Sequence, residues 1–275
     1  MRSRLLRRPN AKIGAVLIAV MLVAAVFGVM YTPYDPIINN LHARLVAPSG
    51  QHWLGTDEWG RDVFSRLLNG ASVSVFVSFS TVLVSVAIGA LVGALTGYFS
   101  GWPSRFVMLV IDALLAFPSL IMALGVIAVF GASSTGVIIA LSLTYIPAVA
   151  RVVRANVLSL REKEYVEASR VMGNAELYTM LRHALPNAIA PIIVLATALF
   201  GWALLAESAL SFLGLGVPPP ESSWGGMLAD SRNYVDQAPW LAIAPGLAIS
   251  LSLLGVNLFG DALRDEFDPH MKNLA

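Results

Sequence analysis

The sequence VSVFVSFSTVLVSVAIGALVGALTGYF occupies residues 73–99 and contains no charged side chain. A helix needs about 20 mostly apolar residues to cross the hydrocarbon core of a bilayer, so this stretch is long enough to span one. A transmembrane β-barrel would instead show alternating segments of about 10 residues. The uninterrupted apolar run therefore predicts a membrane-spanning helix.

Five further apolar stretches flank this segment along the chain. The first of them follows several arginines and could be a cleaved signal peptide, but its length exceeds a usual signal core and favours a retained helix. The sequence thus predicts an all-α integral membrane protein with six transmembrane helices. The other five are residues 13–30, 106–130, 135–153, 189–210 and 241–260.

The composition supports a membrane location and excludes several other classes. Of the 275 residues 57% are hydrophobic and 13% are charged, and the mean hydropathy is +0.72. Soluble domains carry about 25% charged residues, so a soluble or disordered chain is excluded. The net charge of +1 gives no basic field for nucleic acid. Without cysteine the chain has no disulfide, thiol nucleophile or Cys-ligated metal.

The distribution of basic residues predicts the orientation. With the N-terminus inside, most of the 18 Lys and Arg residues fall on the inner side, and the outer side holds Arg44, Arg61, Arg66 and Arg232. The positive-inside rule therefore places both termini in the cytoplasm. The expected organisation is an N-terminal tail, first helix and extracytoplasmic segment (1–72), a five-helix core (73–260) with a cytoplasmic loop (154–188), and a cytoplasmic tail (261–275).

Glycine recurs at every fourth position near the end of the longest apolar stretch, at Gly89, Gly93, Gly97 and Gly101. Such spacing places small residues on one side of a helix, where another backbone can approach closely. We interpret these glycines as a packing seam.

The cytoplasmic loop has signals for two short helices. Ser159 and Glu162 form an S-x-x-E capping box that predicts the start of the first. Gly173 is a natural left-handed stop, Asn174 can cap the second helix, and Pro186 is expected to end it.

Each of these short helices carries a narrow face of apolar and small residues. The stripes either pack under the membrane domain of the same chain or contact another protein, and the spacing leaves both interpretations open. The first face comprises Tyr165, Ala168, Ser169 and Met172, and the second Leu177, Met180, Leu181 and Ala184.

The same loop resembles the EAA motif of ABC importer permeases, the loop that docks on the ATPase subunit. The resemblance is carried by Glu167-Ala168-Ser169, Gly173 and Leu185-Pro186, with Ser169 in place of the second Ala and His183 in place of Ile. It implies an ATPase-coupling interface formed by Tyr165, Glu167, Ala168, Ser169, Met172, Gly173, Leu177, Leu185 and Pro186.

Further motifs, in the family's order, narrow the resemblance to the dipeptide/oligopeptide/nickel permeases, and to the second, C-type subunit of the pair. This implies the type I importer permease fold and a location in the inner membrane of a prokaryote. The matching segments are LGTD at 54–57, GRDVFSR at 60–66, AFPS at 116–119, ESALSFLGLG at 207–216 with WGGML at 224–228, and NLFGDALRDEFDP at 257–269.

The resemblance also implies partners. We expect a heterodimer with a sister permease in the bilayer, two ATP-binding subunits or domains, an extracytoplasmic substrate-binding protein, and no nucleic acid. Di- and oligopeptides are the expected substrates, with nickel, glutathione-like compounds or haem as alternatives. Two other classes remain open, a secondary transporter or channel acting alone and a non-transporting assembly or receptor subunit.

The sequence does not predict an enzyme. The lysines are Lys12, Lys163 and Lys272, and none follows a glycine as a phosphate-binding P-loop requires. We therefore expect no cofactor or metal in this chain, with ATP and Mg²⁺ bound by partner subunits. The four histidines show no zinc-ligand spacing.

Polar residues within the spans are candidates for the translocation path, because charge in lipid is costly. Asp112 is equally compatible with a structural role as an interhelix hydrogen-bond partner. For Glu207 a structural contact to the 212–216 turn is the favoured alternative. The path candidates are Asp112, Tyr145, Glu207 and Asn257. In the outer segments 31–72 and 212–240, the residues expected to face the binding protein are Asp57, Arg61, Asp62 and Trp224.

Overall fold

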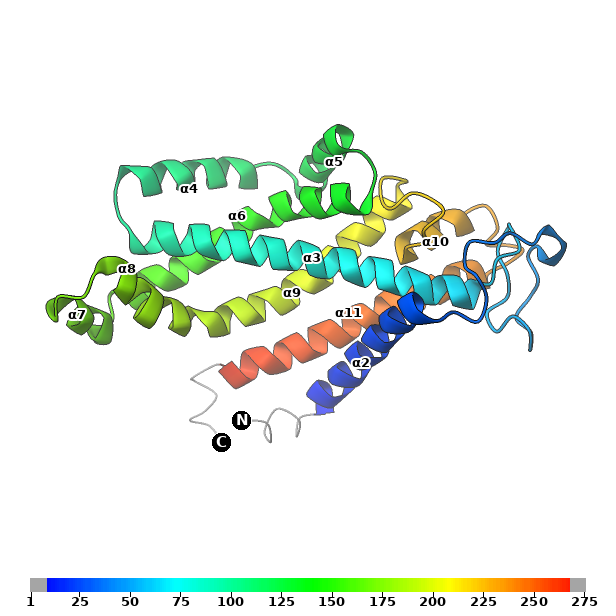
Figure 1. Ribbon diagram of the computed structural model, residues 1–275, viewed down its shortest axis with the longest axis horizontal. Coiled ribbons are helices and arrows are strands. Elements are labelled where there is room, and N and C mark those ends of the chain that lie inside the picture. Colours follow the sequence, from blue (N-terminus) through cyan, green and yellow to red (C-terminus); the bar gives the residue numbers. More distant parts are fainter. Residues whose placement is uncertain (1–8, 268–275) are drawn as a thin grey trace.

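The computed structural model describes residues 9–267, and this part of the chain is helical without a β-strand. Seven longer helices form the body of the molecule (Figure 1). They are α2 (Pro9–Met30), α3 (Val63–Tyr98), α4 (Trp102–Leu115), α5 (Ser119–Phe130), α6 (Ser134–Arg161), α9 (Leu185–Phe212) and α11 (Trp240–Phe267). The shorter elements are η1 (Leu41–Ala43), α7 (Glu164–Val171), α8 (Glu176–Thr179), the π-helical turn η2 (Met180–Ala184) and α10 (Trp224–Ser231).

Five helical segments are long and apolar enough to cross a membrane, and a sixth crossing requires that α4 and α5 together count as one span. The predicted third span over residues 106–130 is not one straight helix, because α4 and α5 meet at an angle of 96°. The break falls at Pro118, which lacks a backbone N–H and disfavours helical geometry in the residue before it. The fold class is confirmed with this correction.

The glycine seam joins α3 to α6. A Cβ atom at Gly89 would lie 2.6 Å from the Cβ of Val149, and one at Gly93 would lie 2.9 Å from the Cβ of Val153. Only glycine permits this approach, so the packing interpretation is confirmed for Gly89, Gly93 and Gly97. Gly101 lies beyond the end of α3 with a φ of 137° and precedes α4.

The first helix packs against the body of the molecule. A Cβ at Gly14 would lie 2.7 Å from the backbone nitrogen of Phe259 in α11, and Gly28 faces the carbonyl of Leu68 in α3. The outer side of α2 exposes apolar side chains such as Val16 and Val20, as expected of a helix in contact with lipid.

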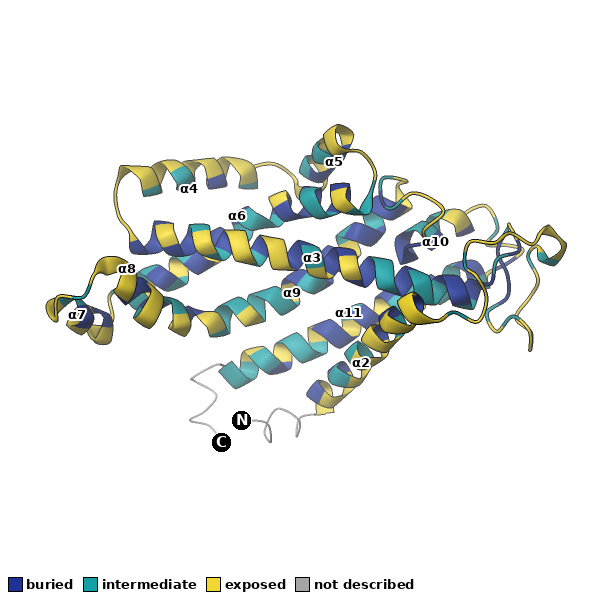
Figure 2. Ribbon diagram, viewed as in Figure 1, coloured by how far each residue is buried: buried dark blue, intermediate teal, exposed yellow. Residues whose placement is uncertain are grey.

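The two ends of the molecule differ in character. Helices α7 and α8 project at one end, which the end of α11 also approaches, and the 31–62 segment lies with α10 at the opposite end (Figure 1). Exposed residues dominate α2, α4 and α7, whereas buried residues line the contact of α3 with α6 (Figure 2). Helix α11 continues past residue 260, the end of the predicted span, as far as Phe267. Residues 268–275 lie outside the described part.

Candidate functional site

The connection from α6 to α9 forms a bent, projecting unit, which we call the elbow (residues 164–184). Its first helix does not begin at the predicted capping box, because Ser159 still belongs to α6. Arg161 prolongs that helix by donating to the carbonyl of Tyr98 at 2.9 Å and to the hydroxyl of Ser100 at 2.6 Å. Helix α7 begins instead after Lys163, whose backbone is extended and whose side chain makes no capping bond.

Gly173 makes the turn between the two arms of the elbow. Its φ of +84° confirms the predicted left-handed stop. Asn174 does not cap the second helix as predicted, since Ala175 takes that position. The Asn174 amide instead donates to the Ser169 hydroxyl at 3.1 Å, which holds the turn against α7.

The second arm runs directly into the span α9. Helix α8 passes into the π-helical turn η2, where the Leu185 N–H bonds to the carbonyl of Met180. Pro186 therefore does not end a helix, contrary to the prediction. It lies in the first turn of α9, where a missing N–H is tolerated. The predicted loop 154–188 is accordingly shorter, with α6 ending at Arg161 and α9 starting at Leu185.

The inner side of the elbow is fixed to the membrane domain. Val166 is fully buried, and the hydroxyls of Ser169 and Thr179 lie 3.0 Å apart between the two arms. The guanidinium of Arg170 lies over the ring of Tyr98 at the end of α3, 5.1 Å from its centroid. The elbow is thus attached to the ends of both α3 and α9.

The outer side of the elbow is apolar and uncovered. Met172 is 73% exposed and Val171 82% exposed. No other part of the described chain covers these two apolar side chains. Of the predicted interface residues, Tyr165, Glu167, Ala168, Met172, Gly173, Leu177 and Pro186 are exposed, Leu185 is half-buried and Ser169 is buried.

At the opposite end, a charged cluster organises residues 31–62, which we call the external segment after their predicted location. Asp57 accepts from the backbone N–H groups of Trp59 and Arg61, both at 2.9 Å, and pairs with the side chains of Arg61 and Arg66. Arg66 also reaches Asp230 at 3.2 Å, which ties α3 to α10. Burial raises the pKa of the Glu58 carboxyl beside this cluster.

The remaining external candidates also have structural partners. Asp62 caps α3 by accepting from the N–H of Ser65 at 2.8 Å, and it contacts His52 at 2.9 Å. The Trp224 indole donates to the Leu67 carbonyl at 3.0 Å. The structure therefore buries Asp57, Asp62 and Trp224 and leaves little of Arg61 exposed. The aromatic side chains exposed in the segment are Tyr31, Tyr34, Trp53 and Trp59.

Two of the four path candidates have clear partners within the chain. Asp112 in α4 forms an ion pair with Arg151 in α6. Glu207 is fully buried and accepts from the hydroxyl of Ser211 at 2.7 Å. Ser211 lies in the same helix, α9, just before the turn at 212–216 that was predicted as the structural contact of Glu207. Arg151 was not among the predicted path residues, although this charge lies within the predicted span 135–153.

The other two candidates lie near α9. The Tyr145 hydroxyl is 3.3 Å from the carbonyl of Trp202. Asn257 is exposed on α11, and its Oδ1 would lie 3.6 Å from a Cβ at Gly201. The structure therefore does not gather the four candidates into one cluster.

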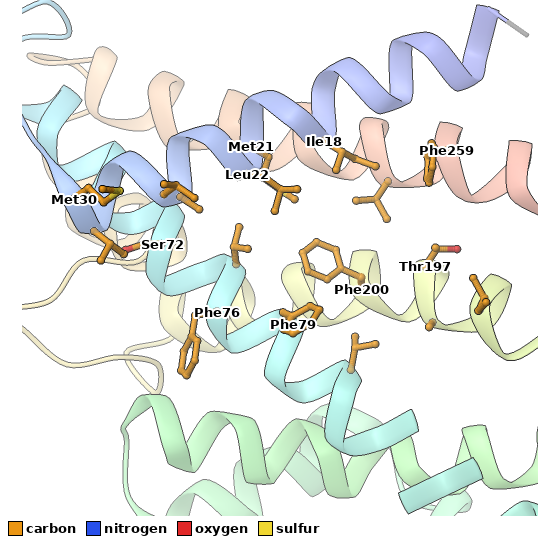
Figure 3. A pocket seen from close by; sticks show the side chains of 18 residues that line it. Ile18, Met21, Leu22, Met30, Ser72, Phe76, Phe79, Thr197, Phe200 and Phe259 are labelled. Atoms are coloured by element: carbon orange, nitrogen blue, oxygen red, sulfur yellow. The ribbon is translucent and has the colours of Figure 1, made fainter. Parts of the chain in front are cut away.

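A cavity of about 870 Å³ opens between α2, α3, α9 and α11 (Figure 3). Apolar side chains such as Leu22, Phe79 and Phe200 line it, and the hydroxyls of Ser72 and Thr197 are its polar groups. A charged substrate would find no ionic partner in this lining. Within the described residues, no group of three His, Asp or Glu residues could hold a metal.

The chain matches two protein-family models over most of its length. The model for the binding-protein-dependent transport system inner membrane component matches residues 89–273. The chain belongs to this family. The model for the N-terminal TM domain of oligopeptide transport permease C matches residues 1–48. The chain is therefore a multi-pass membrane permease component of an ABC importer, a class in which ATP hydrolysis lies on separate subunits.

Individual relatives cover nearly the whole chain. A putative peptide transport system permease protein of Brucella suis is 43% identical over 98% of this chain and 90% of its own length. The dipeptide transport system permease protein DppC of Alkalihalophilus pseudofirmus is 39% identical over 98% and 89%. The glutathione transport system permease protein GsiD of Escherichia coli is 41% identical over 98% of this chain and 89% of its own length.

Proposed function

We propose that this permease forms, with a sister permease, the translocation path of a di- or oligopeptide importer, and that partner ATPases drive it through the elbow. One observation carries the proposal. The elbow is exposed and apolar on its outer side, yet fixed to the membrane domain on its inner side. A surface of this kind can receive a partner and transmit its movement.

The route of transmission follows from the contacts. Arg170 joins α7 to the end of α3, and the second arm continues through η2 into α9. A partner that shifts the elbow would therefore pull on two spans at once. Nucleotide-driven closure of an ATPase pair would in this way change which side of the membrane the path faces.

The substrate class is inferred from the relatives. Two of the three relatives described above are named for peptides or dipeptides and the third for glutathione, which is itself peptidic. Peptides are thus favoured over nickel or haem. The external segment, whose cluster around Asp57 fixes its shape, would meet the substrate-binding protein through exposed groups such as Trp53 and Trp59.

The docking role predicts the effect of a charge on the outer side of the elbow. Met172→Glu is expected to abolish co-purification of the ATPase and ATP-driven dipeptide uptake, because the carboxylate would be desolvated in an apolar contact. Both would be measured after reconstitution of the full transporter in proteoliposomes. Val235→Glu is the matched control, since Val235 is 45% exposed in the loop before α11.

Undiminished ATPase binding and uptake in the Met172→Glu variant would contradict the proposal. Gradient-driven dipeptide uptake by this chain without any ATPase would also contradict it, and would favour a secondary transporter.

A further inference from the structure

A charged pair joins α4 and α6, two helices from stretches that are predicted to cross the membrane. The guanidinium of Arg151 donates to Asp112, and both side chains are 56% exposed in the isolated chain. Asp112 lies ten residues after the start of α4, and Arg151 lies ten residues before the end of α6. Both positions fall inside predicted spans, Asp112 in 106–130 and Arg151 in 135–153.

Lipid is an unfavourable environment for this pair. Charged side chains in transmembrane segments face a bundle interior or a water-filled cavity, because their exposure to hydrocarbon is costly. A small apolar cluster of Met108, Ile111 and Ala150 holds α4 against α6 and leaves the outer side of the ion pair open. That outer side must therefore face water or protein in the assembled transporter.

Both groups retain capacity for a second partner. Arginine has five N–H donors, and a carboxylate accepts at both of its oxygens. Within the described residues, the pair accounts for one guanidinium nitrogen of Arg151 and one oxygen of Asp112. A ligand that carries both an anion and a cation can thus bind the two side chains while they remain in place.

We infer that Asp112 and Arg151 bind the charged termini of a peptide in the translocation path. The Arg151 guanidinium receives the terminal carboxylate, and the Asp112 carboxylate receives the terminal ammonium group. The inference rests on the proposed function, because it takes the substrate to be a peptide. The apolar cavity of Figure 3 offers neither contact.

The test uses the whole transporter, with its sister permease, ATPases and binding protein, and dialanine as substrate. Asp112→Asn and Arg151→Gln are each expected to lower dialanine uptake roughly tenfold, the effect of losing one hydrogen bond to a charged group. Arg151→Lys should keep part of the uptake because it keeps the charge. Asp261→Asn removes an exposed carboxylate on α11, outside both the elbow and the outer segments, and serves as the matched control.

A second measurement separates peptide binding from a purely structural ion pair. The chain has no cysteine, so Ala155→Cys places a single thiol one turn from Arg151 on the exposed side of α6. A water-soluble thiol reagent should label this cysteine, and dialanine should slow the labelling during turnover. The slowing should disappear when Arg151→Gln is added.

Each outcome decides the inference. Normal uptake by both single variants, labelling that dialanine does not affect, or a cysteine that is unreactive because the sister permease covers it would overturn it. If the sister permease is lost when the single variants are purified, Asp112 and Arg151 form an assembly contact with it rather than a peptide-binding site, and the inference is likewise overturned. If the unmodified transporter takes up no dialanine, the proposed function fails rather than this inference.

Discussion

At the scale of single residues, the backbone conformation of Gly173 is the most demanding feature of the elbow. Its φ of +84° is in the left-handed region, and no neighbouring atom lies within 4 Å of the position of a Cβ. The constraint is therefore conformational rather than steric. Side chains other than those of glycine, asparagine and aspartate are strained in this region.

This difference predicts opposite outcomes for two substitutions. Gly173→Val should distort the turn at a cost of about 1–2 kcal/mol, lowering the population of the native elbow by roughly 5- to 30-fold. Gly173→Asn should be tolerated. The ratio of dipeptide taken up to ATP hydrolysed would measure the difference, and an equal ratio for the two variants would contradict it.

Residue types alone could not show which candidates face a partner. Asp57 and Trp224 belong to motifs expected at an external interface, but their polar atoms bind backbone groups of the same chain. Asp57 accepts from the N–H of Trp59, and Trp224 donates to the carbonyl of Leu67 in α3. A carboxylate that accepts backbone N–H bonds looks the same in sequence as one that faces solvent. By contrast, Gly173 could be predicted, because a left-handed helix stop depends on local geometry alone.

At the scale of secondary-structure elements, the close contact of α3 with α6 depends on the absence of side chains in the seam. Gly93→Val is expected to force the helices apart and to destabilise the protein by about 1–3 kcal/mol, as overpacked cores do. The unfolding midpoint in detergent would measure this change. Gly125→Val is the matched control, since nothing lies within 4 Å of a Cβ there, and equal shifts would contradict the prediction.

Helix positions could be predicted from hydropathy, whereas helix ends and breaks could not. The run at 73–99 marks α3, but the helix begins ten residues earlier because Asp62 caps it and Arg66 finds ionic partners. The apolar run across Pro118 hides a bend of 96°, because hydropathy does not register a missing backbone donor. Both differences arise from hydrogen bonding rather than from apolarity.

At the scale of the whole molecule, the elbow and the external segment lie at opposite ends (Figure 1). With the predicted orientation, an impermeant thiol reagent added to intact cells should label Val235→Cys and not Met172→Cys. Both sites are exposed, and the chain has no competing cysteine. The reverse labelling pattern would show that the membrane orientation is inverted.

The π-helical turn at Met180–Ala184 sets the rotation of the elbow about the axis of α9, the span that follows it. A π turn accommodates one residue more than an α turn, so losing that residue would rotate the elbow by about 100° relative to α9. The Met172 side would then point away from the ATPase that we propose to bind there, with every side chain still present. Chain length across these five residues is thus as strict a requirement as their chemistry.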